Sequence, residues 1–509
     1  MARLKDVAAA ARSVATGMAM KRGAPPEFHA PLPTREDLGV VVLAPERRDA
    51  VAMALDAGAL VAAGLLADGS VNSEELVAGC VARILEHDPA LRSVIELAPD
   101  AVAQARAADE RRRAGTLRGP LDGIPISVKA NVSVAGMTVS AGAEILDGHA
   151  GPDAELVARL RDAGVVVLAT ANLSELAGAV SRTPGTSALG GRTVNPFGDQ
   201  FTPGGSSSGS AVSVAAGLVP LSVGTETSGS LIAPATFCGL VAIKPSRGLV
   251  SGDGVVPLIR FQDTAGPLAP TVREAATLLD AMAGSTTVPD RGDALAEARV
   301  GVLRAEVEAQ KSPLEDVATN APMLDLVESG LRAAGAVPVP TSMQDRQAVE
   351  RGLLKLVFGG LAHDTIGYLA AAGAPVSSVA ELHAYNLADP RRRMPFGQDL
   401  LTAALVMHPS LAAYEEGALA LRGQAVRILD ETFERASADV LVSMSNTHSA
   451  VYAVAGYPAV TVPLGLRSSG MPAGATFIGR AGSDATLVAA AYAFEQATLL
   501  RARPAGRPD

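Results

Sequence analysis

Apolar and polar residues alternate with two different periods along the first quarter of the chain. Residues 73–88 and 98–114 carry apolar positions at helical spacing, and the second stretch ends in a charged run before a glycine. From Ile124 to Lys129 the period changes to two, so that aliphatic residues lie on one face and Ser127 and Lys129 on the other. The pattern predicts two helices followed by a short strand that ends at Lys129.

Helical stretches and short apolar runs continue to alternate through the first half of the chain. Such an alternation is typical of α/β proteins, in which helices cover the faces of a sheet. We therefore predict an α/β fold. The helical stretches are residues 153–163 and 271–283, and the strand-like runs are Val165–Ala169 and Leu218–Val223.

A change of composition separates this half from the rest. Residues 284–297 are rich in Ser, Thr, Pro, Asp and Gly, which marks an internal boundary. Residues 320–436 are then mostly helical, and apolar runs return only near the C-terminus. This order predicts a helical insertion whose flanking strands share one sheet. The returning runs are Val440–Val442, Val460–Val462 and Ala475–Ile478, followed by a closing helix over about 484–500.

The overall composition excludes several classes of function. Hydrophobic residues make up 48% of the chain, but no apolar run approaches the roughly 20 residues of a membrane helix. The formal net charge of -10 argues against nucleic acid as a partner, and the Arg391–Arg393 run is interpreted as a solvated loop. Arg12 interrupts the apolar stretch that a signal peptide needs, so we expect an amphipathic helix over residues 1–20 and a cytoplasmic protein.

The side chains that bind metals or form disulfides are sparse. The two cysteines, Cys80 and Cys238, lie in apolar segments, which favours buried thiols over a disulfide or a metal cluster. The histidines are scattered without the spacing of a metal site, and Trp is absent, so we expect no metal, no cofactor and a pocket of aliphatic and small residues. The histidines are His29, His87, His149, His363, His383, His408 and His448.

Two segments dense in glycine and serine, Pro203–Ser210 and Gly224–Ser230, are the most unusual part of the sequence. A flexible linker would fit the composition, but an apolar stretch of buried character separates the two segments. A phosphate-binding loop would place Lys and then Ser or Thr after its last glycine, where this chain has Ser210 and Ala211. The third interpretation is nucleophilic catalysis by a hydroxyl group, for which close approach of the backbone requires glycine.

The nucleophile hypothesis has two versions. In the first, Gly205–Gly209 forms the G-x-S-x-G elbow of α/β-hydrolases, with Asp439 and His448 following in the expected order. An elbow requires a buried strand directly before it, whereas polar residues and Pro203 precede this segment. Asp439 also lies only nine positions from His448. We therefore disfavour a Ser-His-Asp triad.

In the second version, the sequence resembles the amidase-signature family over roughly residues 70–500. Several separated motifs occur in the family's order, which makes the resemblance specific. It implies an α/β fold with a large mixed β-sheet core flanked by α-helices. The motifs are GPLDGIPISVKANV (Gly119–Val132), ANLSELA (Ala171–Ala177), the segment Thr202–Ser246, QDTAGPLAPTVREAA (Gln262–Ala276), AGYPAVTVPLG (Ala455–Gly465) and AYAFEQAT (Ala491–Thr498).

The resemblance also implies a catalytic triad of two serines and a lysine. Ser230 corresponds to the nucleophile, Ser206 to a bridging serine with a cis peptide bond, and Lys129 to the base, while Ser207 is expected to support the lysine. A lysine accepts a proton only when neutral, so Lys129 must be desolvated to lower its pKa from about 10.4. The resemblance places the donors that stabilise the oxyanion on the backbone amides of Thr227, Ser228, Gly229 and Ser230.

The chain departs from the usual family pattern at several positions. Many members carry Asp where this chain has Ala130, and read G-T-D-T-G-G-S-I-R where this chain has Glu226, Ser228 and Ile232. If the missing acid and arginine normally pair, losing both is less damaging than losing one. The T-E-T-x-G-S variant and residues Glu381–Asp399 resemble the peptide-amidase-like branch of the family.

We therefore predict a serine hydrolase that cleaves the C–N bond of a carboxylic amide through an acyl-enzyme. The expected substrate is a peptide-like or aliphatic carboxamide that releases ammonia or a small amine. The alternatives are an acyl-transfer or amide-forming enzyme with the same triad, an aryl-acylamidase or esterase, and a catalytically weak binding or assembly protein. We expect a monomer or homodimer with no nucleic-acid or membrane partner. The expected organisation is an N-terminal helical extension over 1–68, an amidase-signature domain over 69–500 with a mostly helical insertion at about 300–436, and a tail over 501–509.

Overall fold

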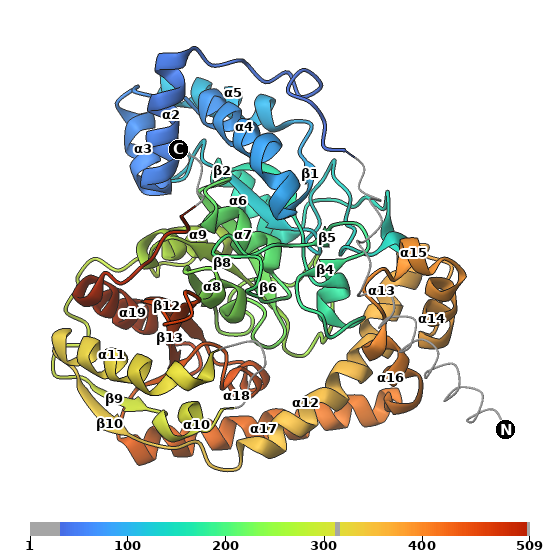
Figure 1. The fold of residues 1–509 in the computed structure, drawn as a ribbon, viewed down its shortest axis with the longest axis vertical. Helices are drawn as coiled ribbons and strands as arrows, with labels where there is room; N and C mark the ends of the chain where they lie inside the picture. The colour runs from blue at the N-terminus through green and yellow to red at the C-terminus, as the bar shows by residue number, and fades with distance from the viewer. Residues whose placement is uncertain (1–30, 311–315, 506–509) are drawn as a thin grey trace.

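The computed structural model of the protein describes residues 31–310 and 316–505. One mixed sheet of 11 strands forms its centre, in the order β1-β3-β2-β6-β8-β7-β12-β13-β11-β9-β10 (Figure 1). The predicted α/β fold with a large mixed sheet is therefore confirmed. The strands are β1 Val94–Leu97, β2 Pro125–Lys129, β3 Val166–Ala171, β6 Leu221–Glu226, β7 Val241–Lys244, β8 Thr264–Ala269, β9 Arg299–Val302, β10 Val337–Pro340, β11 Val440–Met444, β12 Ala459–Leu466 and β13 Pro472–Gly479, while β4 Thr186–Ser187 and β5 Gly191–Arg192 pair separately.

Helices cover the sheet, and none in the described part of the chain is long and apolar enough to cross a membrane. In the first half, α7 packs on β2, β3, β6 and β8, and α9 packs on β6, β7 and β8. The helices before the insertion are α2 Pro45–Ala57, α3 Ala59–Ala67, α4 Ser73–Leu91, α5 Ala101–Ala114, α6 Glu155–Asp162, α7 Ser208–Ala215, α8 Ile232–Phe237 and α9 Val272–Ala283. The later ones are α10 Arg304–Glu308, α11 Asn320–Ala333, α12 Arg346–Gly360, α13 Ile366–Ala371, α14 Val379–Ala388, α15 Pro390–Arg393, α16 Asp399–Met407, α17 Leu411–Ala436, α18 Ser449–Ala455 and α19 Asp484–Thr498.

Strand β2 shows why the polar residues of this region are buried. Every residue of β2 is buried, because the strand lies inside the sheet between β3 and β6, in parallel with both. Its polar face is covered by α7, and the Ser127 hydroxyl lies 2.8 Å from Ser222 Oγ and 3.1 Å from Ser213 Oγ. Buried hydroxyls thus find partners among themselves, as buried polar groups must.

The insertion is mostly helical, but it also lengthens the sheet. Strands β9 and β10 lie within or at the start of this stretch and form the edge beyond β11. Helices α12 and α17 run side by side along the lower edge of Figure 1, and α13 to α16 form a group at one end of this pair. A second hydrophobic cluster, distinct from the main core, holds this group together.

The run Arg391–Arg393 is not the solvated loop that we predicted. It lies in the short helix α15, whose N-terminus is capped by the Asp389 side chain. The Arg392 and Arg393 side chains both form ion pairs of 3.1 Å with Glu144, a residue from the first half of the chain. The charge run therefore attaches the insertion to the core.

The described part of the predicted N-terminal extension consists of α2 and α3. Val51, Leu55 and Leu66 on these helices belong to the same hydrophobic core as Leu76 on α4. The predicted extension over 1–68 remains a prediction as a separate unit, and the helix expected over residues 1–20 lies outside the described residues.

One edge of the sheet collects the residues that the sequence singled out. The parallel strands β2 and β6 end there with Lys129 and Glu226. Antiparallel β8 begins at the same edge, because Thr264 pairs with Glu226. The segment before β8 and the glycine- and serine-rich turn after β6 are therefore neighbours.

The lack of a side chain at Gly209 allows α7 to lie close to the backbone of Ser93 and Asn172. Its amide donates to Asn172 O at 2.9 Å, and a methyl group at Gly209 would overlap Ser93 O and the backbone of Asn172. We predict that Gly209→Ala destabilises the protein by about 1–3 kcal/mol, because the backbone cannot give way as a flexible side chain would. Urea unfolding measures the change.

The matched control is Gly64→Ala in α3. Nothing lies within 4 Å of the position that its methyl group would take. Alanine favours a helix interior over glycine by up to about 1 kcal/mol, so this variant is expected to be neutral or more stable. Equal effects of the two substitutions would contradict the close contact at Gly209.

Candidate active site

Lys129 is fully buried, and its ammonium group is surrounded by oxygen atoms. Nζ donates to Ser206 Oγ at 2.7 Å, to Thr225 Oγ1 at 2.8 Å and to Thr225 O at 3.3 Å. Burial lowers the pKa of Lys129 to about 7, although the nearby carboxylates of Asp263 and Glu226 act in the opposite direction. Near neutral pH, a large fraction of Lys129 is therefore able to accept a proton.

Ser206 belongs to the first glycine- and serine-rich segment and lies where that segment meets the second. The peptide bond Gly205–Ser206 is cis, and the Ser206 carbonyl accepts a hydrogen bond of 3.0 Å from the Ser174 amide. The Ser207 amide donates to the Ser230 carbonyl at 3.2 Å. The two segments, which are separated by α7 and β6 in the chain, thus meet at the serines.

Ser207 does not contact Lys129, and its connection to the lysine runs through Thr225. The Ser207 hydroxyl donates to Thr225 O at 2.9 Å and lies 3.2 Å from the Thr225 amide. Asn131 Nδ2 donates to Thr225 Oγ1 at 3.1 Å. Thr225 therefore connects Lys129 to Ser207 and Asn131, a role that the sequence analysis missed.

Glu226 is buried beneath the turn that carries Ser230. Its Oε2 accepts the backbone amides of Leu231 at 2.8 Å and Ile232 at 3.2 Å. Burial raises the pKa of Glu226, whereas the amides of Leu231, Gly229 and Ile232 and the charge of Lys244 lower it. The other carboxylate oxygen, Oε1, is buried and has no hydrogen-bond partner among the described residues.

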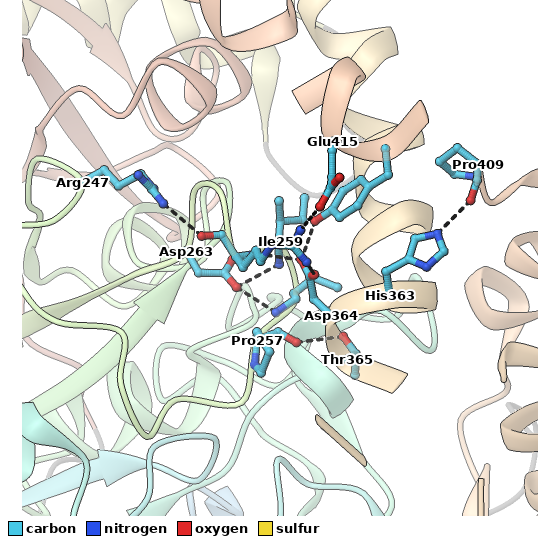
Figure 2. Close-up of polar contacts among 12 residues, drawn as sticks. Arg247, Pro257, Ile259, Asp263, His363, Asp364, Thr365, Pro409 and Glu415 are labelled. Carbon is cyan, nitrogen blue, oxygen red and sulfur yellow. Dashed lines mark hydrogen bonds and ion pairs between the residues drawn. The ribbon is translucent and has the colours of Figure 1, made fainter. Parts of the chain in front are cut away.

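The other side of the same turn is held by the segment before β8. Thr227 Oγ1 donates to Asp263 Oδ1 at 2.5 Å, and Gln262 Nε2 donates to Thr227 O at 2.8 Å. Asp263 Oδ2 accepts the amides of Leu258 at 2.7 Å and Ile259 at 2.9 Å (Figure 2). Burial nevertheless raises the pKa of Asp263 to about 6.

Ser230 sits at the end of this turn with 8% of its surface exposed. Its hydroxyl has no hydrogen-bond partner within residues 31–310 and 316–505, so it is free to approach a ligand. Gly229 has φ +75°, a conformation that favours glycine, and a side chain there would press against Asn446 and Ser449. The Ser228 hydroxyl lies 3.4 Å from Ser449 Oγ.

The geometry contradicts the α/β-hydrolase version of the nucleophile hypothesis. His448 is buried, its Nδ1 lies 2.6 Å from Ser443 Oγ, and burial lowers its pKa to about 3. Asp439 is exposed and forms an ion pair with Arg480 instead. These two residues therefore do not form a charge relay with a serine of the Gly205–Gly209 segment.

The two cysteines and the metal-binding types of side chain are the remaining candidates for chemistry. Cys80 and Cys238 are buried free thiols, and burial raises the pKa of both, that of Cys80 to about 12. Among the described residues, no group of three His, Cys, Asp or Glu side chains is arranged to hold a metal ion.

The buried lysine predicts a specific dependence of stability on pH. The pKa of Lys129 is about 7 in the folded protein and near its ordinary value of 10.5 in the unfolded chain. Between these values the unfolded chain binds more protons, so stability rises with pH by up to about 1.4 kcal/mol per unit. We expect Lys129→Met to be more stable than wild type at pH 7 and to lack this contribution at pH 7–10, as measured by urea unfolding.

The control is Lys355→Met, which removes an exposed lysine from α12. This variant is expected to keep the wild-type slope. A slope that is equal in wild type and Lys129→Met would mean that Lys129 keeps its proton throughout this range.

The chain is similar in sequence and in fold to known amidases. The chain matches the Amidase family over residues 75–443. The solved structure of native peptide amidase from Stenotrophomonas maltophilia has 37% sequence identity and a TM-score of 0.80, covering 89% of this chain and 99% of that chain. A probable amidase of Arabidopsis thaliana is 34% identical over 460 residues, which are 85% of this chain and 88% of the relative.

A second group of relatives consists of amidotransferase subunits. One of them is a component of the glutamyl-tRNA(Gln) amidotransferase of Symbiobacterium thermophilum, which is 31% identical over 496 residues, covering 86% of this chain and 96% of the relative. The family match covers more than half of the chain, and both relatives are covered over most of their length. This chain therefore belongs to the amidase family and is an amide-hydrolysing enzyme.

Proposed function

We propose that this amidase hydrolyses an uncharged, peptide-like or aliphatic carboxamide through an acyl-enzyme on Ser230. The observation that carries the proposal is the buried Lys129, whose pKa of about 7 and 2.7 Å hydrogen bond to Ser206 suit a general base. We assign the bridging role to Ser206.

The reaction then runs in two halves. Ser230 Oγ attacks the amide carbon and passes its proton to Ser206, while Ser206 passes its own proton to neutral Lys129. When the C–N bond breaks, Ser206 gives a proton to the departing nitrogen and takes one back from Lys129. Water repeats the attack on the acyl-enzyme, releasing the acid and restoring Ser230.

Backbone amides of the turn are proposed to stabilise the oxyanion. The proposed donors are the backbone amides of Thr227, Ser228, Gly229 and Ser230. Donors that are fixed before the reaction need no reorganisation as charge develops. The hydrogen bonds to Asp263 and Gln262 supply that fixation for Thr227.

The proposed substrate class rests on the peptide amidase relative and on the composition of the chain. That relative has 37% sequence identity, and the structural similarity covers 89% of this chain. The insertion contacts the core beside the ANLSELA motif, where the amide of Leu400 donates to Val180 O at 3.1 Å. We propose a cleft between the sheet edge and the insertion, and a monomer or homodimer that acts in the cytoplasm without a nucleic-acid partner.

Acyl transfer is the second candidate, because the amidotransferase relatives are also similar over most of the chain. The same acyl-enzyme would then pass to ammonia or an amine instead of water. Product analysis over a range of concentrations of a primary amine separates the two functions, since a transfer enzyme forms the new amide in preference to the acid, whereas a hydrolase releases mainly the acid.

The central prediction is that Ser230 carries the acyl group. A fluorophosphonate should add once to the protein, and peptide mapping should place it on Ser230. Ser230→Ala should lose the adduct and lower kcat by several orders of magnitude, as loss of a nucleophile does. The substrate panel consists of blocked dipeptide amides, fatty-acid amides, free dipeptides and anilides, scored by ammonia or amine release.

Two results would contradict this proposal in different ways. An adduct on Ser207 would overturn the assigned nucleophile. Turnover of anilides or fatty amides with every peptide amide inert would overturn the substrate class and leave the triad intact. His448→Ala is the matched control, and we expect its kcat to stay near that of wild type because His448 takes no part in the relay.

The contact between Asp263 and Thr227 should affect catalysis more than substrate binding. In Asp263→Asn, one oxygen cannot accept from both Thr227 and the amides of Leu258 and Ile259. We predict that kcat falls by roughly tenfold to a hundredfold, the usual effect of a small displacement at a reacting centre, with little change in KM.

Thr227→Val removes the other partner of the same contact. Its effect should be similar, and the double variant should be no worse than either single one. Asp253→Asn, an exposed neighbour in the chain, is expected to leave kcat unchanged. Additive effects of the two substitutions would show that Asp263 and Thr227 act separately.

A further inference from the structure

A cavity of about 520 Å³ lies between α2, α4 and the segment before α2. The lining residues from α2 and from the segment before it precede residue 75, where the match to the Amidase family begins. Its floor is apolar and is built from side chains such as Val51, Leu55 and Ala82. The volume is within the range of small-molecule sites in proteins. The cavity is lined by none of the residues of the candidate active site.

The rim of this cavity is basic. Arg35 and Arg48 line it, and neither forms an ion pair with a residue in the described parts of the chain. Arg83 lies beside them with a carboxylate partner, Asp56, at 2.9 Å. Glu86 is the one acidic residue of the lining, so the two unpaired arginines leave an excess of positive charge in a protein whose net charge is -10.

The mouth of the cavity also leaves apolar surface uncovered. Val41, which lines the cavity, is 40% exposed, and its neighbour Val42 is 71% exposed. An apolar floor, an apolar mouth and two guanidinium groups without acidic partners match a ligand with an aliphatic body and a carboxylate. Guanidinium groups bind carboxylates with paired, charge-assisted hydrogen bonds.

We propose that this cavity is a binding site for a small aliphatic carboxylate, separate from the active site. The N-terminal segment of the chain is a poor occupant by charge. Residues 1–30 contain five Lys or Arg and two Asp or Glu, so their charge has the same sign as the rim. The ligand is therefore a separate molecule.

The site is connected to the catalytic edge through one helix. Arg83 Nη1 donates to Gly217 O at 3.0 Å, in the turn that joins α7 to β6. Helix α7 begins directly after Ser207, and β6 ends at Glu226. A ligand that engages Arg83 is therefore linked, through that arginine, to the turn that follows α7.

The experiment uses octanoate as the probe and isothermal calorimetry as the measurement. We expect saturable binding to the full chain with a Kd of roughly 0.1–1 mM, the scale for a ligand of this size. The Arg35→Gln/Arg48→Gln variant should bind at least about tenfold more weakly. Ala82→Phe, which fills the floor, should abolish binding, and Arg332→Gln on α11 should leave it unchanged.

Two further experiments test whether the carboxylate is required for binding and whether the site is distinct from the active site. Octanol and octylammonium should bind much more weakly than octanoate, because they lack the anion. Protein whose active serine has been blocked by a fluorophosphonate should still bind octanoate. Loss of binding on blocking, equal binding of octanol, or unchanged binding by the arginine variant would each overturn the proposal.

Discussion

The burial of one ammonium group governs the catalytic edge of this protein. Lys129 is fully buried, so its charged form loses the solvation of bulk water and depends on nearby oxygens and carboxylates. Asp263 and Glu226 both favour that charged form, yet burial raises the pKa of each carboxyl as well. Three groups that would hold full charges in water therefore share a site in which each charge is costly. As a result, the pKa of Lys129 is lowered to about 7.

The two carboxyl groups have a second role in shaping the turn between them. Glu226 lies beneath the turn and accepts the amides that follow Ser230, while Asp263 holds the Thr227 hydroxyl from the side. This arrangement explains how the chain accommodates Ile232 in place of an arginine. The Glu226 carboxylate is compensated by backbone amides and by Lys244, which is itself buried with a pKa lowered to about 8. No side chain at position 232 is needed for that compensation.

The sequence predicted β2, β3 and β6 and the helices α4, α5, α6 and α9 of the first half, because apolar periodicity is a local signal, but it predicted no strand at β1 or β7. It missed β8, whose TAGPLA sequence contains glycine and proline, and β10, where two prolines occupy a strand of four residues. It also missed Thr225 and Asp263 as neighbours of the catalytic groups. Their positions depend on the pairing of Val128 with Val223 and of Glu226 with Thr264, and strand register is a long-range property.

The insertion is connected to the segment before β8 by polar contacts that converge on the buried carboxylate of Asp364 (Figure 2). Arg260, three residues before Asp263, binds Asp364 Oδ1 at 2.7 Å, and Tyr414 Oη donates to Asp364 Oδ2. The Arg260 side chain is 43% exposed, so the ion pair itself adds little net stability, but the Arg260 amide also donates to Asp364 Oδ2 at 2.9 Å. The insertion is thus fixed against the same segment that holds Thr227. Any change in the insertion that disturbs Asp364 should therefore also disturb the segment whose Gln262 and Asp263 side chains hold Thr227.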